Sequence, residues 1–233
     1  IRTETPPAIN GKLDGPAWKR AVVLRDFTVS QSFNDRSLPS PAGDATETMV
    51  LYDDKGLYVG VRAFQDPKTI YTTIKANGWL RPDLDWEQGS EEWANTGCDE
   101  IEIAIDPELT MAGYYLFHVN PDGIRQTHYM PPVPTGGGSS KRVDPVLITD
   151  DRWKAAATRD DKGWCATFFI PFESIGFRPI AAAAAGDVFF DMVQDRTVMG
   201  FNVNRISHQR REPSSWSPSK GAMFFRDVEN FGN

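Results

Sequence analysis

The strongest constraint on the fold is a stretch of strict two-residue alternation between residues 99 and 106. Three isoleucines there alternate with mostly acidic residues, and the two sets are Ile101, Ile103 and Ile105 against Glu100, Glu102 and Ala104. Successive side chains of a β-strand point to opposite faces, and a β-branched face suits a sheet that packs on one side. The stretch therefore predicts a half-buried strand with a core-facing isoleucine face and a solvated acidic face.

Similar segments, rich in β-branched and aromatic residues, recur along the chain. In the clearest of them, Met49–Tyr52 and Leu57–Phe64 flank the turn Asp53–Gly56 and predict a hairpin. The other predicted strands are 114–120, 124–129, 152–158, 164–170, 187–193, 200–206 and 222–226. Only Phe172–Ile175, after Pro171, resembles a helical turn. We therefore expect an all-β fold, a single-domain antiparallel β-sandwich of jelly-roll or immunoglobulin-like type, with about ten strands and long loops.

Length and composition limit the domain organisation and the classes of partner. No linker and no internal repeat divides the 233 residues, so we expect one domain over residues 1–233. No apolar run approaches the ~18 residues of a membrane span. A net charge of -7 argues against a nucleic-acid surface, which needs a basic face. Cys98 and Cys165 are compatible with one disulfide or with two buried thiols.

Catalytic motifs are sparse. Glu100 and Glu102 lie on the same face of the predicted strand, so their carboxylates would be roughly 6–7 Å apart. That separation resembles the acid pair of an inverting glycosidase. Alternating acids are also the ordinary composition of a solvated strand face. The chain has no Gly-x-Ser-x-Gly elbow, no Cys-x-x-Cys pair and no phosphate-binding loop.

Oxygen-rich side chains make a hard cation a better prospect. Calcium takes six to eight oxygen ligands from carboxylates, amides and carbonyls. The acids that we expect to supply them are Asp14, Asp99, Asp106 and Asp122, with Asn10, Glu102 and Asn120 as further oxygen donors. No EF-hand spacing is present, so calcium would have a structural role in sites assembled from several loops.

Four of the seven tryptophans lie in polar, Pro-rich or Ser-rich segments. They are Trp79, Trp86, Trp93 and Trp216. A large apolar ring in such a segment is costly unless something covers it. Aromatic faces stack on the C–H face of a pyranose, so each of these rings could contact a sugar or could simply pack in the fold.

Six segments together resemble the family 9 carbohydrate-binding modules and their relatives in the DOMON-type sandwich superfamily. In order along the chain, these segments are 9–18 (INGKLDGPAW), 51–59 (LYDDKGLYV), 98–107 (CDEIEIAIDP), 119–123 (VNPDG), 163–172 (GWCATFFIPF) and 215–218 (SWSP). Each segment alone is weak evidence, whereas six in the family's order are fairly specific. The resemblance extends from Ile9 to about Phe231.

The resemblance implies a non-catalytic module that binds a polysaccharide or a sugar chain end in a Trp-lined cleft, with calcium in structural sites and no organic cofactor. Matched by motif position, the two stacking rings are Trp216 and Trp93, with Trp86 as a rival to Trp93. The polar partners would be Glu102, Asn120, Asn204 and Arg205. The resemblance further implies an extracellular or periplasmic protein that is accessory to a glycoside hydrolase.

Two alternatives remain open. Some DOMON-type sandwiches hold b-type haem between Met and His or Lys, and this chain has candidate ligands in His118, His128, Met130 and Met199. The second alternative is a glycoside hydrolase that uses Glu100 and Glu102.

Overall fold

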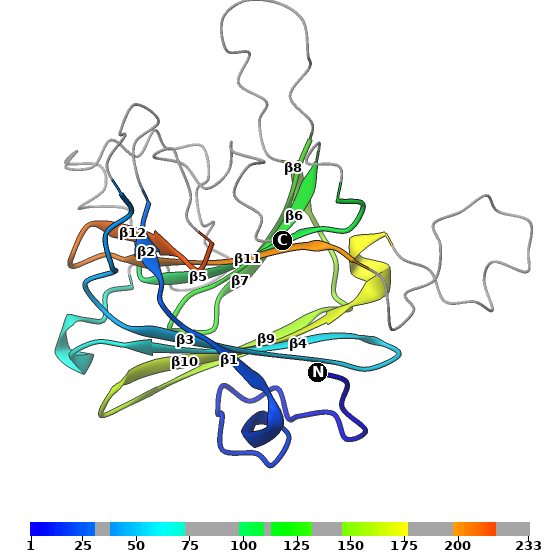
Figure 1. Ribbon diagram of the computed structural model, residues 1–233, viewed down its shortest axis with the longest axis horizontal. Coiled ribbons are helices and arrows are strands. Elements are labelled where there is room, and N and C mark those ends of the chain that lie inside the picture. The colour runs from blue at the N-terminus through cyan, green and yellow to red at the C-terminus, as the bar shows by residue number, and fades with distance from the viewer. Residues whose placement is uncertain (31–37, 73–97, 110–112, 132–145, 177–197, 218–233) are drawn as a thin grey trace, which may run out of the picture.

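Two antiparallel sheets face each other in the computed structural model, which describes residues 1–30, 38–72, 98–109, 113–131, 146–176 and 198–217 (Figure 1). The five-stranded sheet has the order β1 (Val22–Leu24), β3 (Thr46–Tyr52), β4 (Gly56–Phe64), β10 (Gly163–Pro171) and β9 (Lys154–Asp160). The seven-stranded sheet has the order β2 (Thr28–Val29), β12 (Glu212–Ser215), β11 (Gly200–Ser207), β5 (Glu100–Asp106), β6 (Tyr114–Val119), β7 (Arg125–Met130) and β8 (Val146–Ile148). The predicted all-β sandwich is confirmed.

Helix is limited, within the described segments, to three 3₁₀ turns. They are η1 (Trp18–Arg20), η2 (Pro67–Thr69) and η3 (Phe172–Ile175). The last is the helical turn predicted after Pro171, and Gly176 ends it in a left-handed conformation with φ 88°. A search of the described residues finds no apolar helix with the length of a membrane span.

The predicted hairpin is the β3–β4 pair, and Asp53 organises its turn. One carboxylate oxygen of Asp53 accepts hydrogen bonds from the backbone N–H groups of Lys55 and Gly56, and the other accepts from the Tyr58 hydroxyl. An Asp that bonds to the backbone two residues further on is a typical turn former. The local sequence is therefore sufficient to specify this connection.

Four strands were not predicted, namely β1, β2, β8 and β12. They contain two to four residues each, which is too short for alternation to be recognised. The predicted strands 187–193 and 222–226 lie outside the described residues.

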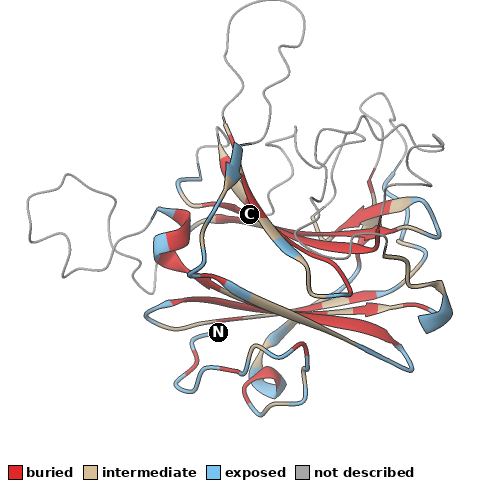
Figure 2. Ribbon diagram, turned by 180° about the vertical axis from the view of Figure 1, so that it is seen from behind, coloured by how far each residue is buried: buried red, intermediate tan, exposed pale blue. Residues whose placement is uncertain are grey.

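The main core lies between the sheets. It contains the isoleucine face of β5 together with inward side chains of β4, β6, β10 and β11, among them Val59, Phe117, Trp164 and Val203. Each such side chain contributes about 1.5–3 kcal/mol of burial free energy. Figure 2 shows both sheets as largely buried ribbons.

The N-terminal segment covers the outer face of the five-stranded sheet (Figure 1). Its Gly11 N–H donates to Oγ1 of Thr167 over 2.8 Å, and its carbonyl accepts from Oγ1 of Thr158 over 2.6 Å. Trp18 packs closely against Gly60, since a Cβ added at position 60 would be 3.1 Å from the Trp18 ring. The motif at the start of the chain thus forms a second apolar cluster on the outer face of this sheet.

One prediction about β5 is wrong. Its acidic face was expected to be solvated, yet Glu100 and Glu102 are both buried, like Ile101 between them. A carboxylate loses its hydration when it is buried, so it requires partners. Those partners define the candidate site.

The two cysteines are free and buried. Cys165 belongs to β10 of the five-stranded sheet, whereas Cys98 lies directly before β5 of the other sheet. The structure thus decides between the two states that the sequence left open.

Candidate functional site

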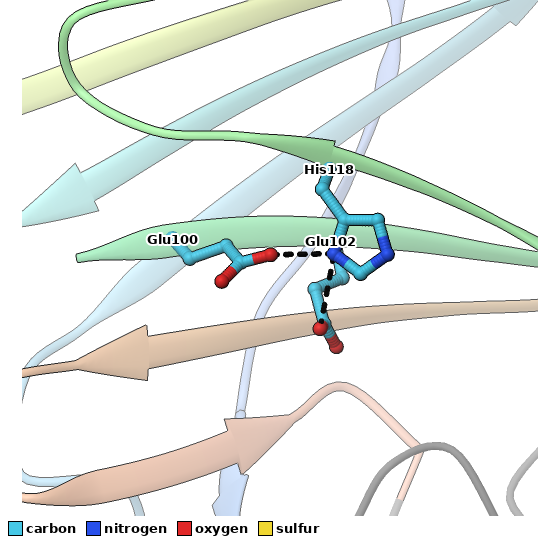
Figure 3. Close-up of side chains that lie close together, drawn as sticks. All are labelled: Glu100, Glu102 and His118. Atoms are coloured by element: carbon cyan, nitrogen blue, oxygen red, sulfur yellow. Dashed lines mark hydrogen bonds and ion pairs between the residues drawn. The ribbon is translucent and has the colours of Figure 1, made fainter. Parts of the chain in front are cut away.

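A cluster of buried charged side chains lies on the outer face of the seven-stranded sheet. Glu100 and Glu102 come from β5 and His118 from the adjacent strand β6, where it pairs directly with Glu102 (Figure 3). All three point away from the core because they alternate with core residues such as Ile101 and Phe117. Strand pairing, rather than sequence proximity, brings them together.

His118 connects the two carboxylates. Its Nδ1 lies 2.5 Å from Oε1 of Glu100 and 3.3 Å from Oε1 of Glu102. The other ring nitrogen, Nε2, lies 3.2 Å from Nδ1 of His128 on β7. The two imidazole rings meet edge to face, with 5.1 Å between their centroids. The result is a chain of polar contacts across β5, β6 and β7.

The environment gives the two histidines different protonation states. Burial opposes the charge on His118, but the carboxylate charges and the hydrogen bond to Glu100 outweigh burial and raise its pKa to about 10. Burial, followed by the charge of His118, lowers the pKa of His128 to about 3. Burial raises the pKa of Glu100, and the attraction of His118 only partly offsets this. At neutral pH the cluster therefore holds an imidazolium beside a neutral imidazole.

Asn204 extends the cluster onto β11. Its side chain faces Glu102 across the β11–β5 pair, and Nδ2 donates to Oε2 of Glu102 over 3.2 Å. Oδ1 of Asn204 and Nε2 of His128 are buried and make no hydrogen bond to any residue that the structure describes. Buried polar atoms are normally satisfied, so such atoms are candidates for binding a ligand. The structure thus brings together two of the predicted sugar-binding residues, Glu102 and Asn204.

Arg205 is separated from that pair. It follows Asn204 in the strand, so its side chain points to the opposite face, between the sheets. Its guanidinium donates to the carbonyls of Ala45 and Phe64 and to the side chains of Thr46 and Gln65. Arg205 therefore connects the seven-stranded sheet to β3, β4 and the residues that flank them.

Asn120 and Trp216 also lie apart from the cluster contacts. Oδ1 of Asn120 accepts from the backbone N–H groups of Asp122 and Ile124, which shapes the turn after β6. Trp216 follows β12, is partly exposed, and packs against the main core, with its ring 6.5 Å from that of Phe201. Trp86 and Trp93 lie outside the described residues.

The four aspartates predicted to bind calcium do not meet in one place. Asp99 and Asp106 lie at opposite ends of β5, about 23 Å apart along the strand. Asp99 accepts from Gln65 and from the backbone N–H groups of Tyr71 and His208.

The other two aspartates are in different surroundings. Asp122 accepts from Thr72 and forms an ion pair with Arg159. Asp14 is exposed and lines a pocket beside the five-stranded sheet. Among the described residues, the group that offers three converging metal-ligand atoms is instead Glu100, Glu102 and His118, with those atoms within 4.8 Å of one another.

The geometry also bears on the two alternatives. The carboxylate oxygens of Glu100 and Glu102 are closer than the roughly 6.5–9.5 Å of an inverting pair, because both contact one nitrogen of His118. As for haem, Met199 packs against the main core whereas His118 lies on the outer face, and His118 and His128 are in direct contact. Met130 packs with Ala104 and Leu116 on that outer face as well, so Met199 is the one proposed haem ligand that lies apart from the other three.

Sequence reasoning placed the members of this cluster in separate hypotheses. The sequence offers Glu100 and Glu102 as a catalytic pair, and His118 and His128 as haem ligands. The alternation of 114–120 around core residues such as Phe117 is a signal that His118 points outward. No local signal gives the register that places His118 opposite Glu102.

Comparisons with known proteins are informative only at the level of structure. The sequence matches no family model and no curated protein. A family 9 carbohydrate-binding module from Caldicellulosiruptor kristjanssonii, solved with cellotriose, matches with a TM-score of 0.58 at 14% identity, covering 100% of this chain and 89% of that one. The same kind of module solved with glucose gives 0.55 at 13% identity, with coverages of 100% and 92%.

A third solved structure agrees. A putative carbohydrate-binding protein from Bacteroides uniformis ATCC 8492 matches with a TM-score of 0.55 at 13% identity, covering 92% of this chain and 85% of that one. At such low identity the likeness concerns the fold alone. This chain thus has the β-sandwich fold of the family 9 carbohydrate-binding modules.

Proposed function

We propose that this chain is a non-catalytic carbohydrate-binding domain that recognises a β-glucan oligosaccharide or chain end. The observation that carries the proposal is the fold match, which extends over nearly all of a module that was solved with cellotriose. Fold likeness alone does not establish function, so the local chemistry must support it as well.

Local chemistry supports the proposal on the outer face of the seven-stranded sheet. Sugar hydroxyls both donate and accept hydrogen bonds, and they pair well with carboxylates, amides and imidazoles. Glu102, Asn204 and His128 present these groups on β5, β11 and β7 of one sheet, and within the described segments Oδ1 of Asn204 and Nε2 of His128 are unused. We propose these atoms as the polar part of the site.

Trp216 supplies the proposed aromatic part. Its partly exposed ring can keep one face on the core while the other meets a pyranose, and Trp93 or Trp86 would complete a Trp-lined cleft. In this proposal Arg205 is a structural residue, because its guanidinium is already bound to groups of the opposite sheet.

The biological setting belongs to the same proposal. A domain of this kind would act outside the cell or in the periplasm, as an accessory to a glycoside hydrolase. Structural calcium would stabilise its loops. Glu100 and Glu102 would not act as acid and base, because both contact His118.

The test is calorimetric titration of the full chain with cellotriose, preceded by affinity electrophoresis against soluble glucans, xylans and uronic-acid polymers. We expect saturable binding to β-glucan. Trp216→Phe should weaken binding about tenfold, a loss of about 1.4 kcal/mol, while preserving most of the core packing. Trp153→Phe is the matched control, since Trp153 is buried in the main core. Absence of binding to every glycan would refute the proposed function.

A further inference from the structure

We propose that Glu100, Glu102 and His118 form a binding site for a divalent transition-metal ion of the zinc class. The three ligand atoms, Oε1 of each glutamate and Nδ1 of the histidine, converge on one point of the outer sheet face (Figure 3). The inference goes beyond carbohydrate binding and does not depend on it.

Nδ1 of His118 is positioned to bind a metal ion through its lone pair. When Nε2 of His118 donates its hydrogen to Nδ1 of His128, 3.2 Å away, Nδ1 of His118 keeps a lone pair. That lone pair points at two carboxylate oxygens, at 2.5 and 3.3 Å. In the metal-free chain a proton on Nδ1 lies between the ring and the carboxylates, and a bound divalent ion would take the place of that proton. A metal ion at this point would bind all three.

The charges within the cluster do not balance. Two buried carboxylates carry a charge of −2, and within the described part of the chain their ionic partner is His118 alone. A single imidazolium leaves a net negative charge in a desolvated place, which is costly. A divalent ion beside a neutral imidazole would balance both carboxylates. Glu102 is fully buried, and among the described residues its Oε1 has no hydrogen-bond donor, so this oxygen is available as a ligand.

The distances and the ligand types fit an ion of the zinc class. Zinc binds imidazole nitrogen and carboxylate oxygen at about 2.0–2.2 Å, so tetrahedral ligands are about 3.3 Å from one another. Nδ1 of His118 and Oε1 of Glu102 already have a separation of 3.3 Å. Glu100 would have to withdraw by somewhat less than about 1 Å. The imidazole favours zinc, cobalt or nickel over calcium and magnesium, which prefer oxygen ligands alone.

The surroundings match what metal ligands usually require. A histidine ligand normally donates its second ring N–H to an acceptor, and a carboxylate ligand is normally hydrogen-bonded as well. His128 provides the acceptor for His118, and Asn204 donates to the second oxygen of Glu102. The three ligands come from two paired strands of a packed sheet, which holds them in place.

The experiment uses the full chain without an affinity tag, stripped with chelator and dialysed. Zn²⁺ is titrated by calorimetry at neutral pH after long equilibration, because the site is buried. Co²⁺ is the spectroscopic probe, since its visible absorption reports nitrogen and oxygen ligation. We expect one ion per chain, a rise in melting temperature with Zn²⁺, and no competition from calcium.

Two ligand variants and two controls sharpen the test. Glu102→Gln and His118→Asn should each weaken Zn²⁺ binding by about 100-fold or more. This exceeds the loss that is usual when the replaced residue only hydrogen-bonds to a metal ligand. Glu47→Gln and His208→Asn remove a glutamate and a histidine outside the cluster and should bind like wild type. Circular dichroism checks the fold of each variant. Co²⁺ spectra of the wild type test histidine ligation even if a variant misfolds.

The proposal is overturned if the wild-type chain binds neither Zn²⁺ nor Co²⁺, or if the folded ligand variants bind as tightly as the controls. Failure here is distinguishable from failure of the proposed function. A chain that binds cellotriose but no metal refutes only the metal site, whereas a chain that binds metal but no glycan refutes only the carbohydrate function.

Discussion

Asn204 and Glu102 face each other across strands β11 and β5, and Nδ2 of Asn204 donates a hydrogen bond to Oε2 of Glu102 over 3.2 Å. Both side chains are buried. This contact joins β11 to β5, the strand of the acidic motif. Its geometry makes the polarity of Asn204, rather than its size alone, important for the fold.

Asn204→Asp should lower the free energy of unfolding by about 1–3 kcal/mol at neutral pH, because it places a second carboxylate against Glu102 and removes the donor. Urea unfolding followed by fluorescence measures the change. Asn10→Asp is the control, since Asn10 is exposed and uses only its oxygen, to accept from the N–H of Lys12. Equal stability of both variants would show that the Asn204 contact is unimportant.

Arg205→Met should destabilise the chain by at least about 3 kcal/mol, since several hydrogen bonds to a buried guanidinium are lost together. The comparison variant is Arg25→Met, which removes an ion pair between partly exposed groups and should cost less than about 0.5 kcal/mol. Denaturant unfolding gives both values. A small effect at Arg205 would argue against its role in joining the sheets.

Thr167→Val and Thr48→Val should have opposite effects on stability. The Thr167 hydroxyl accepts from Gly11 N–H, so its loss leaves a buried donor unpaired and costs about 1–2 kcal/mol. The Thr48 hydroxyl is buried and has no hydrogen-bond partner in the described part of the chain, so its removal should be neutral or stabilising by up to about 1 kcal/mol. Melting temperatures would rank the two variants, and the reverse order would contradict the structure.

Gly163→Ala should be more damaging than Gly123→Ala, although both glycines have positive φ, at 132° and 77°. Both variants incur the backbone cost of about 1–2 kcal/mol. A Cβ at Gly163 would also lie 2.2 Å from the Ala63 carbonyl oxygen, whereas at Gly123 the nearest atom is 3.9 Å away. We expect an additional loss of about 1–3 kcal/mol at Gly163, measured by calorimetry. Equal losses would mean that β4 can move away at no cost.

The thiols should be unreactive in the native chain. Burial, aided by Asp160 and only partly offset by Arg62, raises the pKa of Cys165 to about 11, so little thiolate is present at pH 8. Cys98 is buried as well. A thiol-reactive chromophore should titrate no cysteine in native buffer and both in guanidinium. Rapid native labelling would contradict the burial of these residues.

Much of the fold follows from local pattern. The alternation around Ile101, Ile103 and Ile105 predicts β5, and the Asp53–Gly56 turn predicts the β3–β4 hairpin; both predictions are confirmed. Strands of two to four residues, such as β2 and β12, were not predicted, because so few residues cannot show a repeated alternation of apolar and polar side chains. Their positions depend on pairing with β11 and with each other.

The sequence by itself determined the face to which each strand residue points, because alternation is a property of the extended backbone. It thereby separates Asn204 from Arg205, even though both were expected to contact a sugar. Only the tertiary structure decided which strands are neighbours and which outer faces are buried. Strand register depends on packing between segments that are distant along the chain. For that reason the contacts of His118 with Glu100 and Glu102 follow from the folded sheet and not from any motif.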